Sequence, residues 1–299
     1  MDRLQAMEVF VAVVDNGGFA SAARRLDLSA PVVTRAVAEL EARLGVALLT
    51  RTTRKMRVTE AGARYADDCR RILADVADSD RATSGSRATV QGTLSVTAPV
   101  LFGNLHVTPI VTDYLRRYPN VDAQCVFVDR VVNLIDEGLD VAVRIGDLPD
   151  SSLKAIAVGR VRRMLVASPD YVAAHGRPRR PDELSGHVLI HPTQVLPYPE
   201  WRFAEGGRPL VQRIRPRLRT TTNDAARSFA LAGLGIARLL SYQVADALAS
   251  GALLPLLEGF ETQPLPVHVV HHEGRHMTQK VRAFVDLAVD ALRANPALR

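Results

Sequence analysis

The sequence predicts a protein of two parts: a helical N-terminal domain with a winged helix-turn-helix, and a larger α/β domain joined to it by a long helix. Three observations support this fold class. Apolar residues recur at helical spacing through the first 44 residues, and a short basic stretch of β character follows them. A continuous amphipathic pattern begins at Thr59. Beyond Gly92, strand-like and helical segments alternate, which is typical of α/β folds.

The composition is that of a globular chain long enough for two or three domains. Its 299 residues are 47% hydrophobic and carry a net charge of +6, a basic balance that admits nucleic acid as a partner. The longest uninterrupted apolar run spans residues 229–237, short of the ~18–20 residues of a transmembrane helix. No signal-peptide pattern is visible, and two cysteines cannot build a disulfide framework. We therefore expect a cytoplasmic protein with no membrane partner.

The first helices follow from apolar spacing and from residues that start and stop helices. Residues 4–14 have helical periodicity, and Asn16-Gly17-Gly18 ends that helix. A second short helix is expected at residues 21–26. After a tight turn, Ser29 is a favourable N-cap, Pro31 suits the first turn, and Gly45 is a favourable C-cap of a helix ending near Leu44. Two short helices joined by a tight turn predict a helix-turn-helix, although many helical bundles share this pattern.

The segment RTTRKMRV, residues 51–58, has four basic side chains within seven positions and the length of a two-stranded wing. Arginines and small hydroxyl side chains in such a hairpin can contact phosphates or a minor groove. A solvated charged hairpin is the alternative. Directly after a helix-turn-helix, the wing interpretation is favoured.

A long helix is expected from Thr59, which can cap it with Glu60 near its positive end. Apolar residues in this helix recur at spacings of four, three and four, as in a heptad seam. These residues are Tyr65, Cys69, Ile72 and Val76. The seam predicts either a dimer contact or an amphipathic helix lying on its own domain. Residues 79–91 are small and polar, as expected of a hinge.

The second half alternates strand-like and helical segments, which predicts a parallel α/β sheet. Strands are expected at residues 94–97, 124–128, 140–145, 163–168, 188–191 and 267–271. Helices are expected at residues 105–118, 131–138, 181–184 and 225–232. Arg213, Arg215, Arg217 and Arg219 alternate with other residues and are expected on one face of an edge strand.

The stretch from Gly17 to Gly62 resembles the winged helix-turn-helix of LysR-type bacterial transcriptional regulators. The matching residues are Ala22, Ala23, Leu26, Ser29, Pro31, Thr34, Arg35, Leu40, Glu41, Leu44, Gly45, Leu48, Arg51, Thr52 and Thr59 to Gly62. Three positions differ in residue type from the commonest family pattern: Ala20 stands where Ser or Thr is frequent, Leu49 where Phe is usual, and Thr34 where Ser is common. Segments such as GTLSVTAPVLFG, YLRRYPNV and NDAARSFALAGLGIA resemble the effector-binding domain of the same family.

The resemblance implies a domain organisation and an oligomer. The DNA-binding domain would span residues 1–58, the linker and dimerisation helix residues 59–88, and the effector-binding domain residues 89–299. This last domain would contain two Rossmann-like lobes, like those of periplasmic binding proteins. Lobe 1 would comprise about residues 92–162 and 267–299, and lobe 2 about residues 163–266. The linker helix would pair with its counterpart, giving a homodimer or homotetramer.

A regulator of this kind would bind double-stranded DNA through its third helix and its wing. The residues best placed on the helix are Ser29, Ala30, Pro31, Thr34 and Arg35. In the wing they are Arg51, Thr52, Arg54 and Lys55. An activator of the family would also contact RNA polymerase.

A small-molecule effector is expected between the lobes, because ligands of open α/β sheets bind beyond the carboxyl ends of strands. The expected contacts are Pro99, Val100, Phe102, Val128, Arg130, Ile145, Thr222 and Asn223. The alternatives are structural roles for Pro99 and Phe102, helix capping for Asn223, and ion pairing of Arg130 with Asp129 or another acid. A cleft lined by few charged residues would suit a small organic acid or an aromatic compound. Trp201 is expected to pack in the core.

The sequence predicts no enzyme, no catalytic residue, no cofactor and no metal site. Residues 272–276 read His-Glu-Gly-Arg-His and match the H-E-x-x-H pattern of zinc peptidases. That chemistry requires both histidines on one helical face, whereas Gly274 interrupts this segment between a strand and a helix. A solute-binding protein of a transporter, and a DNA-binding protein without a ligand, are the remaining alternatives.

Overall fold

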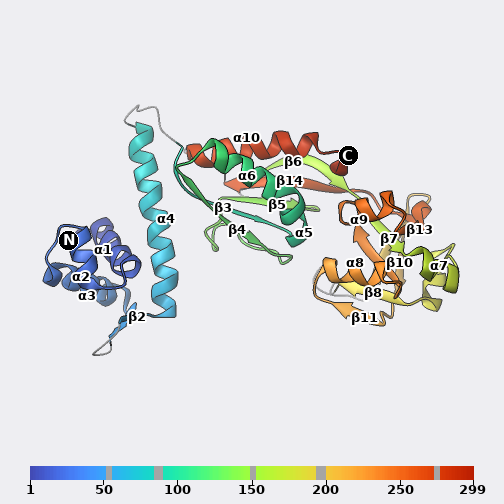
Figure 1. Cartoon of the computed structure of the whole chain (residues 1–299), viewed down its shortest axis with the longest axis horizontal. Coiled ribbons are helices and arrows are strands. Elements are labelled where there is room, and N and C mark those ends of the chain that lie inside the picture. Colours follow the sequence, from blue (N-terminus) through green and yellow to red (C-terminus); the bar gives the residue numbers. More distant parts are fainter. Residues whose placement is uncertain (52–55, 84–89, 149–152, 193–199, 273–276) are drawn as a thin grey trace. The chain divides into compact units, whose positions relative to one another are not determined.

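The computed structural model describes residues 1–299 except 52–55, 84–89, 149–152, 193–199 and 273–276. The chain divides into two compact units, Met1–Thr89 and Val90–Arg299. Figure 1 labels the elements of both units.

The first unit is a helical bundle with a small antiparallel hairpin. Its elements are α1 (Arg3–Asp15), α2 (Phe19–Arg25), α3 (Ala30–Leu44), β1 (Leu49–Arg51), β2 (Met56–Val58) and α4 (Glu60–Thr83). Phe10, Val13, Val33 and Val37 are fully buried where α1, α2 and α3 meet. The predicted helix-turn-helix and its two-stranded wing are therefore confirmed, with α2 beginning two residues earlier than expected.

Local signals set the ends of these helices. Gly45 ends α3 in the left-handed conformation, with φ of 69°, where a glycine carries no side-chain penalty. Thr59 Oγ1 accepts a hydrogen bond from Gly62 N at 2.9 Å and caps α4 as expected. Ser29 occupies the N-cap position of α3, but its side chain makes no capping hydrogen bond.

Gly62 is required by a close backbone approach. A Cβ at this position would lie 2.0 Å from Leu48 O. The first turn of α4 therefore packs directly on the backbone that leads into the wing.

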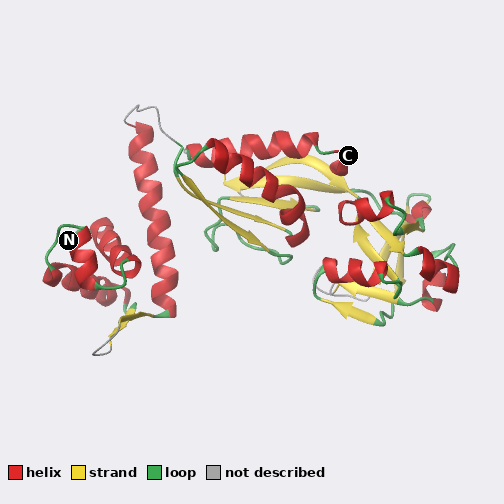
Figure 2. Cartoon of the chain, in the orientation of Figure 1, coloured by secondary structure: helices red, strands yellow, loops and turns green. Residues whose placement is uncertain are grey.

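Lobe 1 of the second unit is a five-stranded sheet in the order β4-β3-β5-β14-β6. The strands are β3 (Gly92–Ala98), β4 (Val121–Phe127), β5 (Val141–Ile145), β6 (Leu153–Val161) and β14 (Leu265–His272). The helices are α5 (Val100–Phe102), a π-helical turn (Gly103–Val107), α6 (Thr108–Arg117), α10 (Gln279–Ala294) and a 3-10 turn (Pro296–Leu298). Figure 2 shows α6 and α10 on one face of this sheet, and Tyr114 and Phe284 fill the core between them.

Lobe 2 is a second five-stranded sheet, in the order β11-β8-β12-β7-β13, with a separate β9–β10 hairpin. Its strands are β7 (Arg163–Ala167), β8 (Leu189–Pro192), β9 (Glu200–Glu205), β10 (Arg208–Arg213), β11 (Leu218–Thr220), β12 (Ile236–Leu240) and β13 (Leu254–Leu256). Its helices are α7 (Pro169–His175), α8 (Asn223–Leu231), α9 (Ser241–Ala249) and the 3-10 turns Pro181–Gly186 and Glu258–Phe260.

The prediction of a purely parallel sheet is wrong, because both sheets are mixed. In lobe 1, β3 is parallel to β4 and β5, whereas β14 is antiparallel to β5 and β6. In lobe 2, β8 is parallel to β11 and β12, whereas β7 is antiparallel to β12. The antiparallel strands β6, β7 and β14 lie where the chain passes from one lobe to the other.

Two further expectations are wrong. Residues 131–138 contain no helix, and only residues 134–138 form turns. The four alternating arginines do not share a strand, since β10 ends at Arg213 and β11 begins at Leu218. In the loop between them Ile214 is buried in the lobe 2 core, while all four arginines are exposed.

Candidate functional site

The helix α3 presents one polar face to solvent and one apolar face to the bundle. Val33, Val37 and Leu40 are buried, which leaves the first turn and Arg35 on the outside. Ser29, Ala30, Pro31 and Arg35 are exposed, and Thr34 is half-buried. The structure thus brings the five predicted helix residues together at the start of α3.

Arg35 is the positively charged residue among the five predicted residues at the start of α3. Its side chain is 82% exposed, and its Nε donates to Glu39 Oε1 at 2.8 Å, one helical turn away. The hydrogen bond from Arg35 lowers the pKa of Glu39 below its ordinary value. An exposed pair of this kind is weak in water, so Arg35 can exchange Glu39 for another acceptor.

Glu41 ties the wing to α3. Its Oε1 accepts hydrogen bonds from Leu48 N at 2.7 Å and Leu49 N at 2.9 Å. Sequence reasoning noted Glu41 in the family match but missed this role, which depends on the turn that follows Gly45. Arg51 is the last residue of β1 and pairs with Met56 of β2. Thr52, Arg54 and Lys55 lie outside the described residues.

The seam predicted on α4 is largely used within one chain. Cys69 is fully buried in the core of the first unit, and the Tyr65 ring lies 5.9 Å from the Phe10 ring of α1. Burial raises the pKa of the Cys69 thiol to about 11, which keeps it protonated and unreactive. The predicted dimer contact is therefore wrong for Cys69, because α1 already covers it. Ile72 also packs against this core.

In lobe 1, Pro99 is the N-cap of α5, and Val100 N donates to Asp129 Oδ1 at 3.0 Å. Val128 and Ile145 are half-buried against the core clusters of this lobe. These residues remain near the ends of β3, β4 and β5, as predicted.

Phe102 belongs to the core. It is fully buried, and its ring lies 4.8 Å from His106 and 5.2 Å from Tyr242. The alternative of a structural role therefore applies to Phe102, which is buried among these rings.

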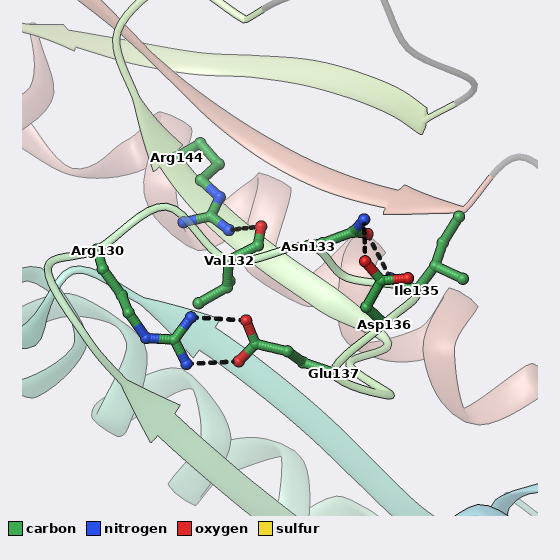
Figure 3. Close-up of polar contacts among 7 residues, drawn as sticks. All are labelled: Arg130, Val132, Asn133, Ile135, Asp136, Glu137 and Arg144. Carbon is green, nitrogen blue, oxygen red and sulfur yellow. Dashed lines mark hydrogen bonds and ion pairs between the residues drawn. The ribbon is translucent and has the colours of Figure 1, made fainter.

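Arg130 is engaged in an ion pair inside its own loop (Figure 3). Its two terminal nitrogens donate to the two carboxylate oxygens of Glu137 at 2.6 and 2.7 Å. Nearby, Arg144 donates to Val132 O at 2.7 Å, and Asn133 donates to Asp136. The alternative of ion pairing therefore applies, with Glu137 as the partner in place of Asp129.

In lobe 2, the predicted residues Thr222 and Asn223 have different roles. Thr222 caps α8, since its Oγ1 accepts from Ala225 N at 3.2 Å. Asn223 lines a cavity of about 40 Å³. The other lining residues are Arg163, His191, Pro192, Trp201, Arg238, Leu239, Leu240 and Gln243. Sequence reasoning missed this cluster, although an arginine inside the apolar strand IARLL was a signal for it.

Within the described ranges, no group of His, Cys, Asp or Glu is arranged to hold a metal ion. Of the H-E-x-x-H match, His272 ends β14, and Glu273, Gly274, Arg275 and His276 lie outside the described residues. No helix in the described part of the chain combines the length and the apolar character needed to cross a bilayer.

Comparisons with known proteins agree with this architecture. Residues 4–63 match the family model "Bacterial regulatory helix-turn-helix protein, lysR family", and residues 87–293 match "LysR substrate binding domain". A regulator named CrgA from Neisseria meningitidis is 33% identical over 97% of both chains. An uncharacterized helix-turn-helix-type transcriptional regulator of Haemophilus influenzae is 32% identical over 94% of this chain and 98% of its own.

A solved structure of CrgA from Neisseria meningitidis is also similar. It covers 99% of this chain and 100% of its own, with a TM-score of 0.63 and 32% identity. The two family models together cover both units, and the relatives match over almost their full length. The chain therefore belongs to the LysR family of bacterial helix-turn-helix transcriptional regulators.

Proposed function

We propose that the protein is a ligand-responsive regulator that binds a specific operator in double-stranded DNA as a homodimer or homotetramer. The observation that carries this proposal is the exposed first turn of α3 with Arg35, next to a wing that Glu41 holds against the same helix. The residues named for base contacts are Ala30, Pro31, Thr34 and Arg35. Arg51, Thr52, Arg54 and Lys55 of the wing would contact the DNA backbone or a minor groove.

The second unit would hold the effector and transmit its binding. Val100, Val128, Ile145 and Asn223 are the remaining cleft residues of this proposal, at strand ends and at the start of α8. An effector can act only by binding two conformations of the regulator with different affinity. Residues 59–88 would serve as linker and dimer helix, and RNA polymerase would be a partner of an activator. The cytoplasm is the compartment of such a regulator.

A DNA-binding titration tests the DNA half of the proposal. The probe is the fragment upstream of the gene for this protein, compared with an unrelated fragment of equal length. The double variant Arg54→Ala/Lys55→Ala should bind both fragments more weakly. Each lost phosphate contact should make the slope of log affinity against log salt concentration less negative by about 0.9. The control is Arg208→Ala/Arg213→Ala, which removes the same charge from β10 in the other unit.

Footprinting on the upstream fragment, with and without candidate metabolites, tests the ligand half. Asn223→Leu should keep the unliganded footprint and lose its ligand-dependent change. Equal affinity of the parent for both fragments would contradict operator recognition, and an unchanged metabolite response in Asn223→Leu would place the effector elsewhere.

A further inference from the structure

Two arginines lie side by side in the interior of lobe 2. Arg238 is in β12, which has β8 and β7 on its two sides, and Arg163 begins β7. In this antiparallel pair, Arg163 lies opposite Leu240 and Arg238 lies opposite Leu165. Because directly opposed residues share a face, both arginines are on the same face of the sheet. Arg238 is only 8% exposed, and Arg163 is half-buried.

Neither arginine has a carboxylate partner in the described part of the chain. Arg238 donates one hydrogen bond to the carbonyl oxygen of Arg202, and its guanidinium lies 5.4 Å from the centre of the Phe203 ring. Its Nε is buried without a hydrogen-bond partner. Asp147 attracts Arg163 only through a longer-range electrostatic interaction.

The electrostatic consequence is an uncompensated positive charge. Burial, and secondarily the charge of Arg163, lowers the pKa of Arg238 to about 10. Burial likewise lowers the pKa of Arg163. A buried charge without a partner is costly, and the cost is recovered only when a counter-charge binds. A carboxylate is the anion whose geometry matches the planar fork of a guanidinium.

Both arginines line the cavity of about 40 Å³, together with Asn223 and Gln243. Asn223 is the first residue of α8, whose amide end favours negative charge. The cavity exceeds the roughly 10–15 Å³ that one water requires, which leaves room for a carboxylate group but not for a whole metabolite. The Trp201 indole donates to His191 Nδ1 at 3.4 Å and forms one wall.

We propose that this cavity, with Arg238 and Arg163 as its cations and Asn223 as an amide donor, binds the carboxylate group of the effector. The effector is then a small organic acid whose remaining atoms extend out of the cavity. This inference rests on the proposed function, because it assigns a ligand class to the same effector domain.

Binding of small carboxylates to the full-length protein tests the inference. The probes are formate and benzoate, each compared with its uncharged amide, formamide or benzamide, at equal ionic strength set with sodium chloride. Both acids should raise the Tm of the parent above the value in chloride alone, and the amides should not. Calorimetry should show that Arg238→Gln weakens benzoate binding about 10- to 100-fold. Arg163→Gln should act in the same direction, and Arg208→Gln on the exposed β10 should leave binding unchanged.

The Tm of the unliganded protein distinguishes a structural role of Arg238 from a role in binding. Arg238→Met removes a buried charge that lacks a partner, so its unliganded Tm should be equal to or higher than that of the parent. A lower Tm with unchanged benzoate affinity would show that Arg238 only supports the fold, and would overturn the inference. The half-buried Arg163 provides the binding test if Arg238 variants do not fold.

The inference also fails if neither acid stabilises the parent beyond chloride, or if benzoate binds Arg238→Gln and Arg163→Gln as tightly as the parent. Operator binding is measured in the same samples. Parent protein that binds its operator but no carboxylate would refute this inference alone. Parent protein that does not distinguish its operator from unrelated DNA would refute the proposed function.

Discussion

Arg35 and Arg238 are the same residue type in opposite surroundings. Arg35 is exposed and loosely held by Glu39, whereas Arg238 is buried with an unpartnered Nε. An exposed arginine is hydrated in the free protein, so its side chain is free to turn toward a base edge. A buried arginine instead selects a counter-charge that enters its cavity. These surroundings support the two proposed roles, a nucleic-acid contact for Arg35 and a small-anion contact for Arg238.

At the residue scale, we expect Arg35→Ala to reduce the preference for operator over unrelated DNA by between about fivefold and 150-fold. The reason is that a bidentate arginine–guanine contact discriminates by that amount, whereas phosphate contacts elsewhere are untouched. Competition gel shifts measure the ratio. The matched control is Arg64→Ala, since Arg64 has the same exposed one-turn ion pair, with Glu60 at 2.8 Å. Loss of preference in both variants, or in neither, would count against a base contact by Arg35.

At the element scale, the two halves of α4 have different surroundings. Its first half packs on α1 through Tyr65 and Cys69. Figure 1 shows its second half extending beyond the bundle of α1, α2 and α3. Val76 lies in this second half and is half-buried, outside the core cluster that includes Ile72. A dimer contact through α4 is therefore better placed at Val76 than at Cys69.

We expect Val76→Glu to shift the protein to smaller oligomers, because a carboxylate in an apolar seam would be desolvated without a partner. The first unit should stay folded, since Val76 lies outside its core. Sedimentation velocity measures the oligomer, and circular dichroism measures the helix content. Ala63→Glu adds the same charge at an exposed position of α4 and should leave the oligomer intact. Identical sedimentation of Val76→Glu and the parent would exclude this seam.

At the scale of the whole second unit, the two lobes meet at an aromatic cluster. Phe102 and His106 of lobe 1 pack around Tyr242 of lobe 2, with ring centres 5.2 and 5.6 Å from it. Asn295 Nδ2 donates to His106 Nδ1 at 3.0 Å, and His106 Nε2 is buried without a partner. This arrangement accommodates neutral His106 and has no acceptor for a second ring proton. Burial accordingly lowers the pKa of His106 below its ordinary value of 6.5.

We expect the second unit to lose stability as the pH falls below 6.5. The unfolded chain then takes up a proton at His106 that the folded chain binds only at lower pH, so acid favours unfolding. The contribution of His106 to the free energy of unfolding is complete above pH 6.5. It decreases as the pH falls from 6.5 toward the lowered pKa of the folded state. Thermal unfolding between pH 5 and 8 measures the slope. His106→Gln should flatten the slope. Equal slopes in the parent and His106→Gln would contradict the mechanism.

Short-range signals were sufficient for most of the first unit. Gly45 stops α3, Thr59 starts α4, and apolar periodicity marks α1 and α3, all through contacts within a few residues. In the second unit the boundary strands β7 and β14 were predicted near their observed starts, and α8 was predicted within a few residues. The family resemblance added the two-lobed architecture, which periodicity alone did not provide.

Long-range packing decided the rest. Residues 131–138 have an apolar pattern compatible with a helix, but they form no helix, and Val132 and Leu134 are buried in a cluster with Ala142 of β5 and Val270 of β14. Cys69 has the spacing of a dimer seam, but α1 covers it first. The cavity around Arg238 joins residues from β7, β8, β9, α8 and α9, which are adjacent only after the sheet has formed. Local sequence determines which elements form, because their hydrogen bonds and caps are local. Only tertiary structure determines which side chains are buried together. In lobe 2 this burial places Arg238 and Arg163 beside one cavity, and their charge is the basis of the proposed ligand class.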